Sequence, residues 1–371
     1  MLNTINIAKF FDGQTLRENV AVSFADGKIV SVEKAEIDIQ PGIMAPGYID
    51  VQVNGGGGAL FNSDPTVETI KTIGLAHAKF GTTGFLPTLI TDKVDVMQLA
   101  ADAVSEALKQ QTPGVLGVHF EGPHLSIPKK GVHSPEFIRS ITKDEMAVFT
   151  RQDLGKVVVT LAPENVSTDD IKTLVSAGVH VCLGHSNADY GTVVKALAAG
   201  ATGFTHLFNA MSAFESRAPG MVGAALLDDN SWCGIIIDGH HVHFDTARLA
   251  IKAKTTGKIM LVTDAMPPVG TDDDSFPFFD SKIIRTGDRL NALTGELAGS
   301  CLDMAGAVKN TVEYLQVELT EALRMASTYP SEFLVLDNQK GRLQPGACAD
   351  FIILNDDLTV QQTWIAGQQV I

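Results

Sequence analysis

Short apolar runs alternate with amphipathic segments through the middle of the chain. Eight such runs have the length and composition of strands buried on both faces, and they end near Val53, Ile90, Glu121, Ala162, His185, His206, Asp238 and Asp264. Most are separated by segments with helical periodicity, at 67–80, 94–111, 169–178, 189–200 and 244–257. Eight strand–helix units predict an α/β protein built on a (β/α)8 TIM-type barrel.

The two ends of the chain follow another pattern, in which polar and apolar residues alternate between turn signals. Asp12-Gly13, Asp26-Gly27 and Pro41-Gly42 punctuate the first segment, and the last residues also offer short strands. We expect residues 1–44 and 340–371 to form a small β-sandwich domain, and residues 45–339 to form the barrel. Residues 267–301 are expected to be a hairpin insertion, followed by helices at about 303–315 and 320–328.

Four of the eight predicted strands end on a side chain that can bind a metal or move a proton. These residues are Glu121, His185, His206 and Asp264. The residue that follows a strand of an α/β barrel lies on the face that carries the chemistry. One carboxylate, two imidazoles and a further aspartate are what a catalytic metal site of the zinc type requires. The pattern therefore predicts a metal-dependent hydrolase.

Composition and charge narrow the function further. The chain has 371 residues, of which 45% are hydrophobic, and its formal net charge is −15. Such a charge repels nucleic acid and anionic membrane surfaces, so we expect neither as a partner. The four cysteines are scattered, and the first residues contain no long apolar stretch. We therefore expect a soluble, unprocessed protein of the reducing cytoplasm.

Each of these residues also has a purely structural interpretation. A single buried histidine is as often structural as functional, and Asp264 could cap a helix or turn before Pro267. His119 is expected to support the site or fill the core, and the histidines at 240, 241 and 243 are candidates for substrate contact. The glycine run after Asn54 is interpreted as a flexible turn, because P-loop spacing is missing.

A series of longer motifs carries a resemblance to a known family. The motifs are, in chain order, IMAPGYIDVQVNG, PTLIT, HFEGPHLSIPKKGVHSP, GHSNA, THLFNAM, ESRAPG, DGHHV, LVTDAMPP, ELAGS and GRLQPGACADFIILN. They span nearly the whole chain from about residue 43. In this order they closely resemble the N-acetylglucosamine-6-phosphate deacetylase family of the amidohydrolase superfamily.

The resemblance implies a role for particular residues. The metal ligands of the family correspond to Glu121, His185 and His206, and its general acid/base corresponds to Asp264. His133 is implied to polarise the substrate carbonyl. The implied substrate-binding residues are Val132, His133, Asn209, Ala210, Arg217, His241, Leu297, Ala298 and Gly299. In such enzymes the arginine of this loop reaches the substrate phosphate of the neighbouring subunit, which implies a homodimer, with a tetramer as the open alternative.

The chain departs from the wider superfamily at one informative position. Many amidohydrolases carry His-x-His after the first barrel strand and bind two metals, whereas this chain has Gln52-Val53-Asn54. Amide oxygens are poor ligands for zinc-like ions, so we expect one divalent metal per chain. Zn²⁺ is the default ion, and Fe²⁺, Co²⁺ or Mn²⁺ would suit the same ligands.

The expected reaction is hydrolysis of N-acetyl-D-glucosamine 6-phosphate to D-glucosamine 6-phosphate and acetate, in amino-sugar metabolism. One alternative is an amidohydrolase that acts on another anionic amide or a cyclic ureide. A second alternative is a barrel scaffold without catalysis, although none of its four key residues is missing.

Overall fold

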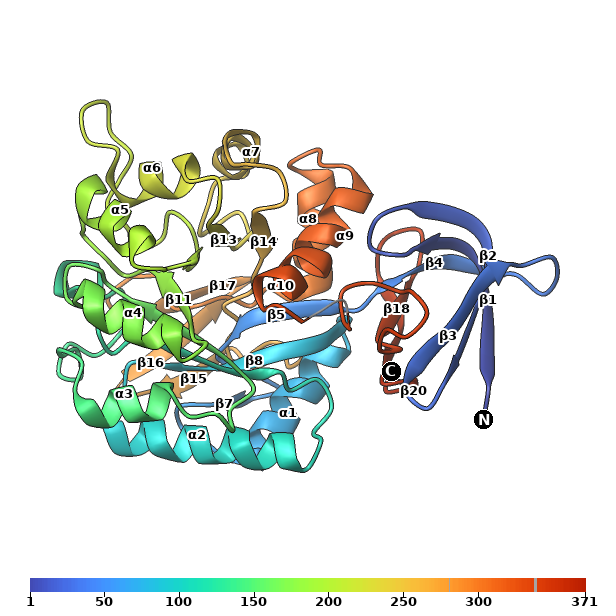
Figure 1. Ribbon diagram of the computed structural model, residues 1–371, viewed down its shortest axis with the longest axis horizontal. Helices are drawn as coiled ribbons and strands as arrows, with labels where there is room; N and C mark the ends of the chain where they lie inside the picture. The colour runs from blue at the N-terminus through green and yellow to red at the C-terminus, as the bar shows by residue number, and fades with distance from the viewer. Residues whose placement is uncertain (280, 337–338) are drawn as a thin grey trace.

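The computed structural model describes residues 1–279, 281–336 and 339–371. Within these residues a parallel eight-stranded sheet forms the centre of the larger body in Figure 1. Its strands are β5 (Tyr48–Val53), β8 (Thr82–Ile90), β9 (Gly117–Glu121), β10 (Lys156–Leu161), β11 (His180–Leu183), β12 (Gly203–Phe204), β13 (Trp232–Ile235) and β14 (Ile259–Leu261). They follow one another in chain order around the sheet. The predicted (β/α)8 barrel is therefore confirmed.

The barrel closes between its first strand and the segment that follows its last strand. Asp264 donates its backbone N–H to Gln52 O at 3.0 Å, and Asn54 donates to Ala265 O at 2.9 Å. Beneath these bonds, the hydroxyl of Thr263 donates to the buried carboxylate of Asp50 at 2.5 Å. This closure brings the end of β5 directly beside Asp264.

Helices cover the outside of the barrel (Figure 1). They are α1 (Val67–Ala78), α2 (Val94–Lys109), α3 (Lys143–Phe149), α4 (Thr168–Ser176), α5 (Tyr190–Ala198), α6 (Gly220–Leu227), α7 (Phe244–Ala253), α8 (Met304–Glu313), α9 (Leu319–Ala326) and α10 (Thr328–Phe333). The five helices expected between strands are present, and α8 and α9 match the helices expected at about 303–315 and 320–328. Helices α3, α6 and α10 were not expected. Helix α3 is short and begins with a complete capping box of Thr142 and Glu145. Helix α6, GMVGAALL, is apolar almost throughout and lacks amphipathic periodicity.

The two ends of the chain pair into one seven-stranded sheet beside the barrel (Figure 1). Its strands are β1 (Asn3–Phe11), β2 (Leu16–Ala25), β3 (Lys28–Lys34), β4 (Gln40–Pro46), β18 (Phe351–Leu354), β19 (Val360–Ile365) and β20 (Gln368–Gln369). Strand β4 joins the two halves, because it pairs with β1 on one side and β18 on the other. The sheet encloses a core of its own, which includes Phe10, Phe24 and Phe351.

The insertion after β14 forms a three-stranded antiparallel sheet of β15 (Ser275–Phe278), β16 (Ser281–Thr286) and β17 (Arg289–Ala292). Its apolar side chains, such as Phe276 and Leu290, pack with Ile90 at the end of β8 and with Met266. The expected hairpin therefore has an additional strand and packs against the mouth of the barrel. The glycine run after Asn54 lies in a short hairpin of two strands with two residues each, β6 (Gly55–Gly56) and β7 (Ala59–Leu60).

The later barrel strands are shorter than the sequence predicts. Strands β11, β12 and β14 end two or three residues before His185, His206 and Asp264. Each of these three residues has a positive φ, of 47°, 31° and 53°. A non-glycine residue with positive φ ends the extended backbone and re-aims the side chain. None of the described helices is long and apolar enough to cross a membrane.

Candidate metal-dependent active site

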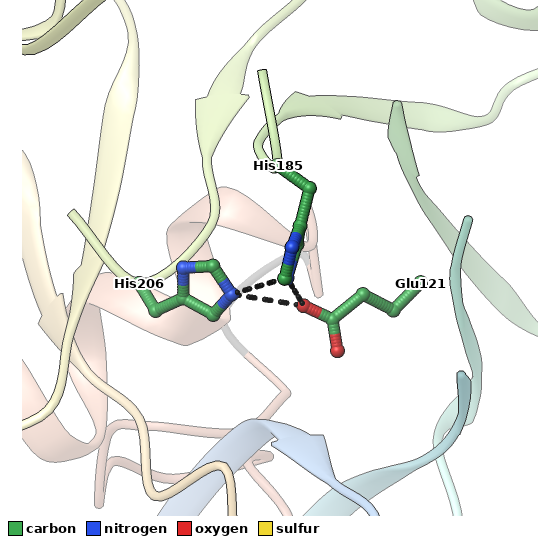
Figure 2. Close-up of side chains that lie close together, drawn as sticks. All are labelled: Glu121, His185 and His206. Carbon is green, nitrogen blue, oxygen red and sulfur yellow. Dashed lines mark hydrogen bonds and ion pairs between the residues drawn. The ribbon is translucent and has the colours of Figure 1, made fainter. Parts of the chain in front are cut away.

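Three side chains from the ends of three barrel strands converge at the mouth of the barrel (Figure 2). Glu121 ends β9, and His185 and His206 follow β11 and β12. Glu121 Oε1 lies 3.2 Å from His185 Nε2 and 3.0 Å from His206 Nε2, and the two imidazole nitrogens lie 3.0 Å apart. All three residues are buried. The sequence predicted this juxtaposition.

The donor set fits a divalent metal ion. Four ligands at zinc-type distances of about 2.0–2.1 Å in tetrahedral geometry lie roughly 3.3 Å from one another, close to the separations found here. A carboxylate and two imidazoles leave one position for water or substrate, as catalytic sites require. The two Nε2 atoms face each other at 3.0 Å, and when each ring carries its proton on Nδ1, both lone pairs can bind one cation.

His185 is already oriented for metal binding. Its Nδ1 lies 2.9 Å from the carbonyl oxygen of Lys129, an atom that can only accept. Nδ1 therefore carries the proton, and the Nε2 lone pair faces the cluster. Although burial acts to raise it, the imidazoles of His185 and His206 beside the carboxylate hold the pKa of Glu121 well below its usual value.

Gln52 and Asn54 connect this cluster to Asp264. Gln52 Nε2 lies 3.2 Å from both carboxylate oxygens of Glu121 and 3.1 Å from Asp264 Oδ1. Asn54 Nδ2 donates to the same Asp264 oxygen at 2.5 Å. Both amides thus act as hydrogen-bond donors, Gln52 to both carboxylates and Asn54 to Asp264 alone, where the wider superfamily places metal-binding imidazoles.

Asp264 lies beside the cluster on a left-handed turn after β14. Burial, and then the charge of Glu121, raise the pKa of its carboxyl group to about 6. A carboxylate with a pKa near working pH is suited to accept a proton and to return it. Among the described residues no helix begins between Asp264 and α8, so the alternative helix-cap role does not apply.

His133 approaches the cluster from the loop that follows β9. The loop contains a short 3-10 turn, Ile127–Lys129, and His133 is 3% exposed at its end. The His133 ring packs against that of His185, with centroids 4.4 Å apart. Burial, and then the neighbouring His185, keep the pKa of His133 well below its usual value, so the ring is neutral.

These residues line one cavity of about 200 Å³. Its walls include most of the site residues expected from the sequence, namely Glu121, Val132, His133, His185, His206, Asn209, Ala210, His241, Asp264, Leu297 and Gly299. His241 is fixed by Asp238, which accepts a hydrogen bond from His241 Nδ1 at 2.6 Å. The cavity is therefore polar at the metal cluster and apolar at the wall formed by the insertion.

Two expected residues do not line this cavity. Ala298 is fully buried behind it and donates its backbone N–H to Leu290 O at 3.2 Å. Arg217 is exposed and lines a neighbouring open hollow with Lys129. Within the described residues neither Arg217 nor Lys129 forms an ion pair. In one chain, then, the predicted phosphate anchor lies outside the metal cavity.

The sequence did not predict some residues that line the cavity, and it correctly left His119 out of the expected metal ligands. Ile90, Gly131 and Met266 line the cavity, but an isolated apolar or glycine residue gives no signal of this in a sequence. His119 does not join the cluster, since its ring nitrogens lie 3.0 Å from Val51 O and 2.7 Å from Thr160 Oγ1. Of the two expected roles, support of the site or filling of the core, these contacts agree with the second, because neither partner is a site residue.

Comparisons with known proteins agree with this geometry. The sequence profile of the Amidohydrolase family matches residues 43–370. An N-acetylgalactosamine-6-phosphate deacetylase of Shewanella sp. (strain ANA-3) is 49% identical, over 97% of this chain and 94% of its own length. An N-acetylglucosamine-6-phosphate deacetylase of Haemophilus influenzae is 38% identical, over 90% and 87%.

Solved structures give the same result. The crystal structure of N-acetylglucosamine-6-phosphate deacetylase from Pasteurella multocida has a TM-score of 0.95 and 34% identity, and the match covers 100% of this chain and 99% of that one. A mutant of the Mycobacterium smegmatis enzyme, solved in complex with N-acetyl-D-glucosamine-6-phosphate, has a TM-score of 0.93 and 26% identity over 100% and 99%. This chain therefore belongs to the amidohydrolase family, and to the branch whose members are named as deacetylases of N-acetylated amino-sugar 6-phosphates.

Proposed function

We propose that the protein hydrolyses the acetamide group of N-acetyl-D-glucosamine 6-phosphate, releasing acetate and D-glucosamine 6-phosphate. The observation that carries this proposal is the convergence of Glu121, His185 and His206 with Asp264 in one cavity. The relatives support the substrate class, because their names specify N-acetylated amino sugars with a 6-phosphate.

The residues divide the reaction between them. Glu121, His185 and His206 would hold one divalent ion, and such an ion would lower the pKa of a water molecule in the site. Asp264, with its raised pKa, accepts the proton of the attacking water and later gives it to the departing amine. His133 donates a hydrogen bond to the acetyl oxygen, on which negative charge develops. Val132, Asn209, Ala210 and the Leu297–Gly299 segment position the sugar.

The 4-epimer is a specific second candidate. The relative with 49% identity is named for N-acetylgalactosamine 6-phosphate, which differs from the proposed substrate only in the configuration at C4. The acetamide and the phosphate would be placed alike for both sugars. Choice between the epimers therefore depends on side chains at the sugar wall and not on the metal cluster.

The phosphate is proposed to bind Arg217 and His241, with Arg217 supplied by the second subunit of a homodimer. The exposed position of Arg217, outside its own metal cavity, supports this arrangement. A guanidinium binds phosphate through a bidentate fork and stays charged at any working pH. A cytoplasmic location stays a prediction, and the four free cysteines are compatible with it.

The test is a substrate panel measured with Zn²⁺, Fe²⁺, Co²⁺ and Mn²⁺ supplied one at a time. It compares both epimeric 6-phosphates, the sugars without phosphate, and anionic amides and cyclic ureides. We expect kcat/KM to be greatest for N-acetylglucosamine 6-phosphate, and His206→Asn to lack activity on every substrate. A preference for the 4-epimer would transfer the assignment to it, and turnover of ureides alone would refute the deacetylase proposal.

A further inference from the structure

A threonine outside the catalytic set contacts the one ring nitrogen of His133 that does not face the cavity. Thr91 directly follows β8 and is 1% exposed. Its hydroxyl oxygen lies 2.8 Å from His133 Nδ1, and both side chains are buried. His133 Nε2 has no hydrogen-bond partner within the described residues, and the ring lines the cavity. The contact with Thr91 therefore decides which nitrogen of the neutral ring carries the proton.

The local backbone leaves room for this hydroxyl. A Cβ atom at position 122 would lie 2.2 Å from Thr91 Oγ1, so any residue other than glycine would displace the hydroxyl. Gly122 also has a φ of 89°, a conformation that side chains rarely adopt. Glycine at position 122, next to Glu121, therefore leaves the space that the Thr91 hydroxyl occupies.

The hydroxyl has one proton, which two neighbouring atoms can accept: the carbonyl oxygen of Glu121, and His133 Nδ1 when the ring proton lies on Nε2. The carbonyl oxygen of Glu121 lies 3.3 Å away, which is longer than an ordinary O–H···O bond of about 2.5–3.0 Å. His133 Nδ1 at 2.8 Å is the closer acceptor. If the hydroxyl donates to Nδ1, the single ring proton must lie on Nε2.

We propose that Thr91 is a positioning residue, whose hydroxyl donates to His133 Nδ1 and thereby fixes the ring proton on Nε2, facing the substrate. This inference rests on the proposed function, in which His133 must donate to the acetyl oxygen. With the proton on Nδ1 the ring would present a lone pair to that oxygen and repel it. Thr91 acts only through His133 and touches neither substrate nor metal ligand side chains.

The first test uses near-isosteric variants and steady-state kinetics on the metal-loaded enzyme. Thr91→Val removes the hydroxyl and keeps the volume, and Thr91→Ser keeps the hydroxyl. We expect Thr91→Val to lower kcat about 10–100-fold, part of the loss typical for removing an oxyanion donor, with KM and metal content within about twofold. Thr91→Ser should restore kcat to within about threefold of the wild type.

Thr82→Val is the matched control. Thr82 lies at the other end of β8, is 3% exposed, and its hydroxyl has no hydrogen-bond partner within the described residues. This variant makes the same chemical change at the opposite end of β8 and should leave kcat and KM unchanged. If it lowers kcat as much as Thr91→Val does, the effect arises from packing of the strand and the proposal is wrong.

The second test observes the tautomer directly. Ring ¹⁵N spectra of the Zn²⁺-loaded, histidine-labelled protein, assigned with His133→Gln, should show the proton on Nε2 in the wild type and in Thr91→Ser. Thr91→Val should show a mixture of tautomers. A wild-type ring protonated on Nδ1 would overturn the proposal whatever the substrate is. If His133→Gln retains full turnover, the assigned role of His133 fails, but the tautomer result still tests Thr91.

Discussion

Glu121 and Asp264 are two carboxylates in one cavity whose surroundings act on them in opposite directions. Paired imidazoles keep Glu121 ionised, whereas burial raises the pKa of Asp264 to about 6. Such a separation assigns the ligand role to one carboxylate and the proton-transfer role to the other. Gln52 touches both and carries no charge, so it links them without competing for a proton.

The first prediction concerns Asp264→Asn. The variant keeps the size of the side chain but cannot take a proton, so turnover should fall by about 10²–10⁴-fold. Metal content and substrate binding should be retained, as measured by elemental analysis and by calorimetric titration. An activity within about tenfold of the wild type would remove Asp264 from the mechanism.

The second prediction concerns the pH dependence of kcat/KM. Asp264 must be ionised to accept a proton, so kcat/KM should decline as the pH falls through about 6. The hydrogen bond from Asn54 stabilises the ionised form and lowers this pKa. Asn54→Leu should therefore move the acidic limb to higher pH. If the limb stays in place in Asn54→Leu, another group titrates there.

At the scale of elements, the sequence predicted the strands and helices that show a regular pattern of apolar residues. It did not predict strand ends, which depend on the backbone conformation of single residues. The eight barrel strands and seven of the described helices, α8 and α9 among them, follow from the pattern of apolar side chains. The exact ends of β11, β12 and β14 do not, because the left-handed residues that follow these strands are His or Asp, not the Gly that would signal a turn. The short, capped α3 and the uniformly apolar α6 likewise carry no helical period.

The third prediction concerns the cap of α8. Asp303 accepts a hydrogen bond from Gly306 N at 2.7 Å, and burial raises its pKa to about 6. The folded state binds this proton more tightly than the unfolded state, so the stability that Asp303 contributes is lost as the pH rises through about 6. Asp303→Asn keeps the cap and cannot ionise. Its stability relative to the wild type should therefore increase by about 1 kcal/mol between pH 5 and pH 8.

Thermal or urea unfolding of the metal-loaded proteins at the two pH values measures this difference. Asp189→Asn is the matched control, because Asp189 caps α5 through Thr192 N but is exposed, and its pKa is lowered by this bond. Its effect on stability should be the same at pH 5 and pH 8, since Asp189 is ionised at both. A pH-independent effect of Asp303→Asn would contradict the assigned ionisation.

For the whole molecule, the fourth prediction is one tightly bound divalent ion per chain. Gln52 and Asn54 donate hydrogen bonds where a second ion would need ligands. Chelation should abolish activity and lower the unfolding temperature, and one equivalent should restore both, because the ion binds only the folded state. Elemental analysis that finds two equivalents, with activity following the second, would contradict this prediction.

The last prediction concerns the phosphate and the assembly together. The net charge of −15 opposes a sugar phosphate on average, so affinity must come from a local cation. Arg217 is exposed in a hollow outside its own metal cavity, which a second subunit can approach. Arg217→Ala should raise KM for N-acetylglucosamine 6-phosphate far more than for the unphosphorylated sugar. Arg248→Ala, which removes a cation from the outer helix α7, should change neither.

Mixing subunits tests whether the site is shared. A dimer of one Arg217→Ala chain and one Asp264→Asn chain contains one site with an intact Asp264 and the partner's intact arginine. Random exchange of equal amounts should therefore recover about one quarter of the wild-type activity. Replacing the second chain with the Asp264→Asn/Arg217→Ala double variant removes that arginine and should recover none. If subunits exchange and the first mixture also stays inactive, each site is built within one chain, and Arg217 would have to reach its own cavity by a movement of its loop.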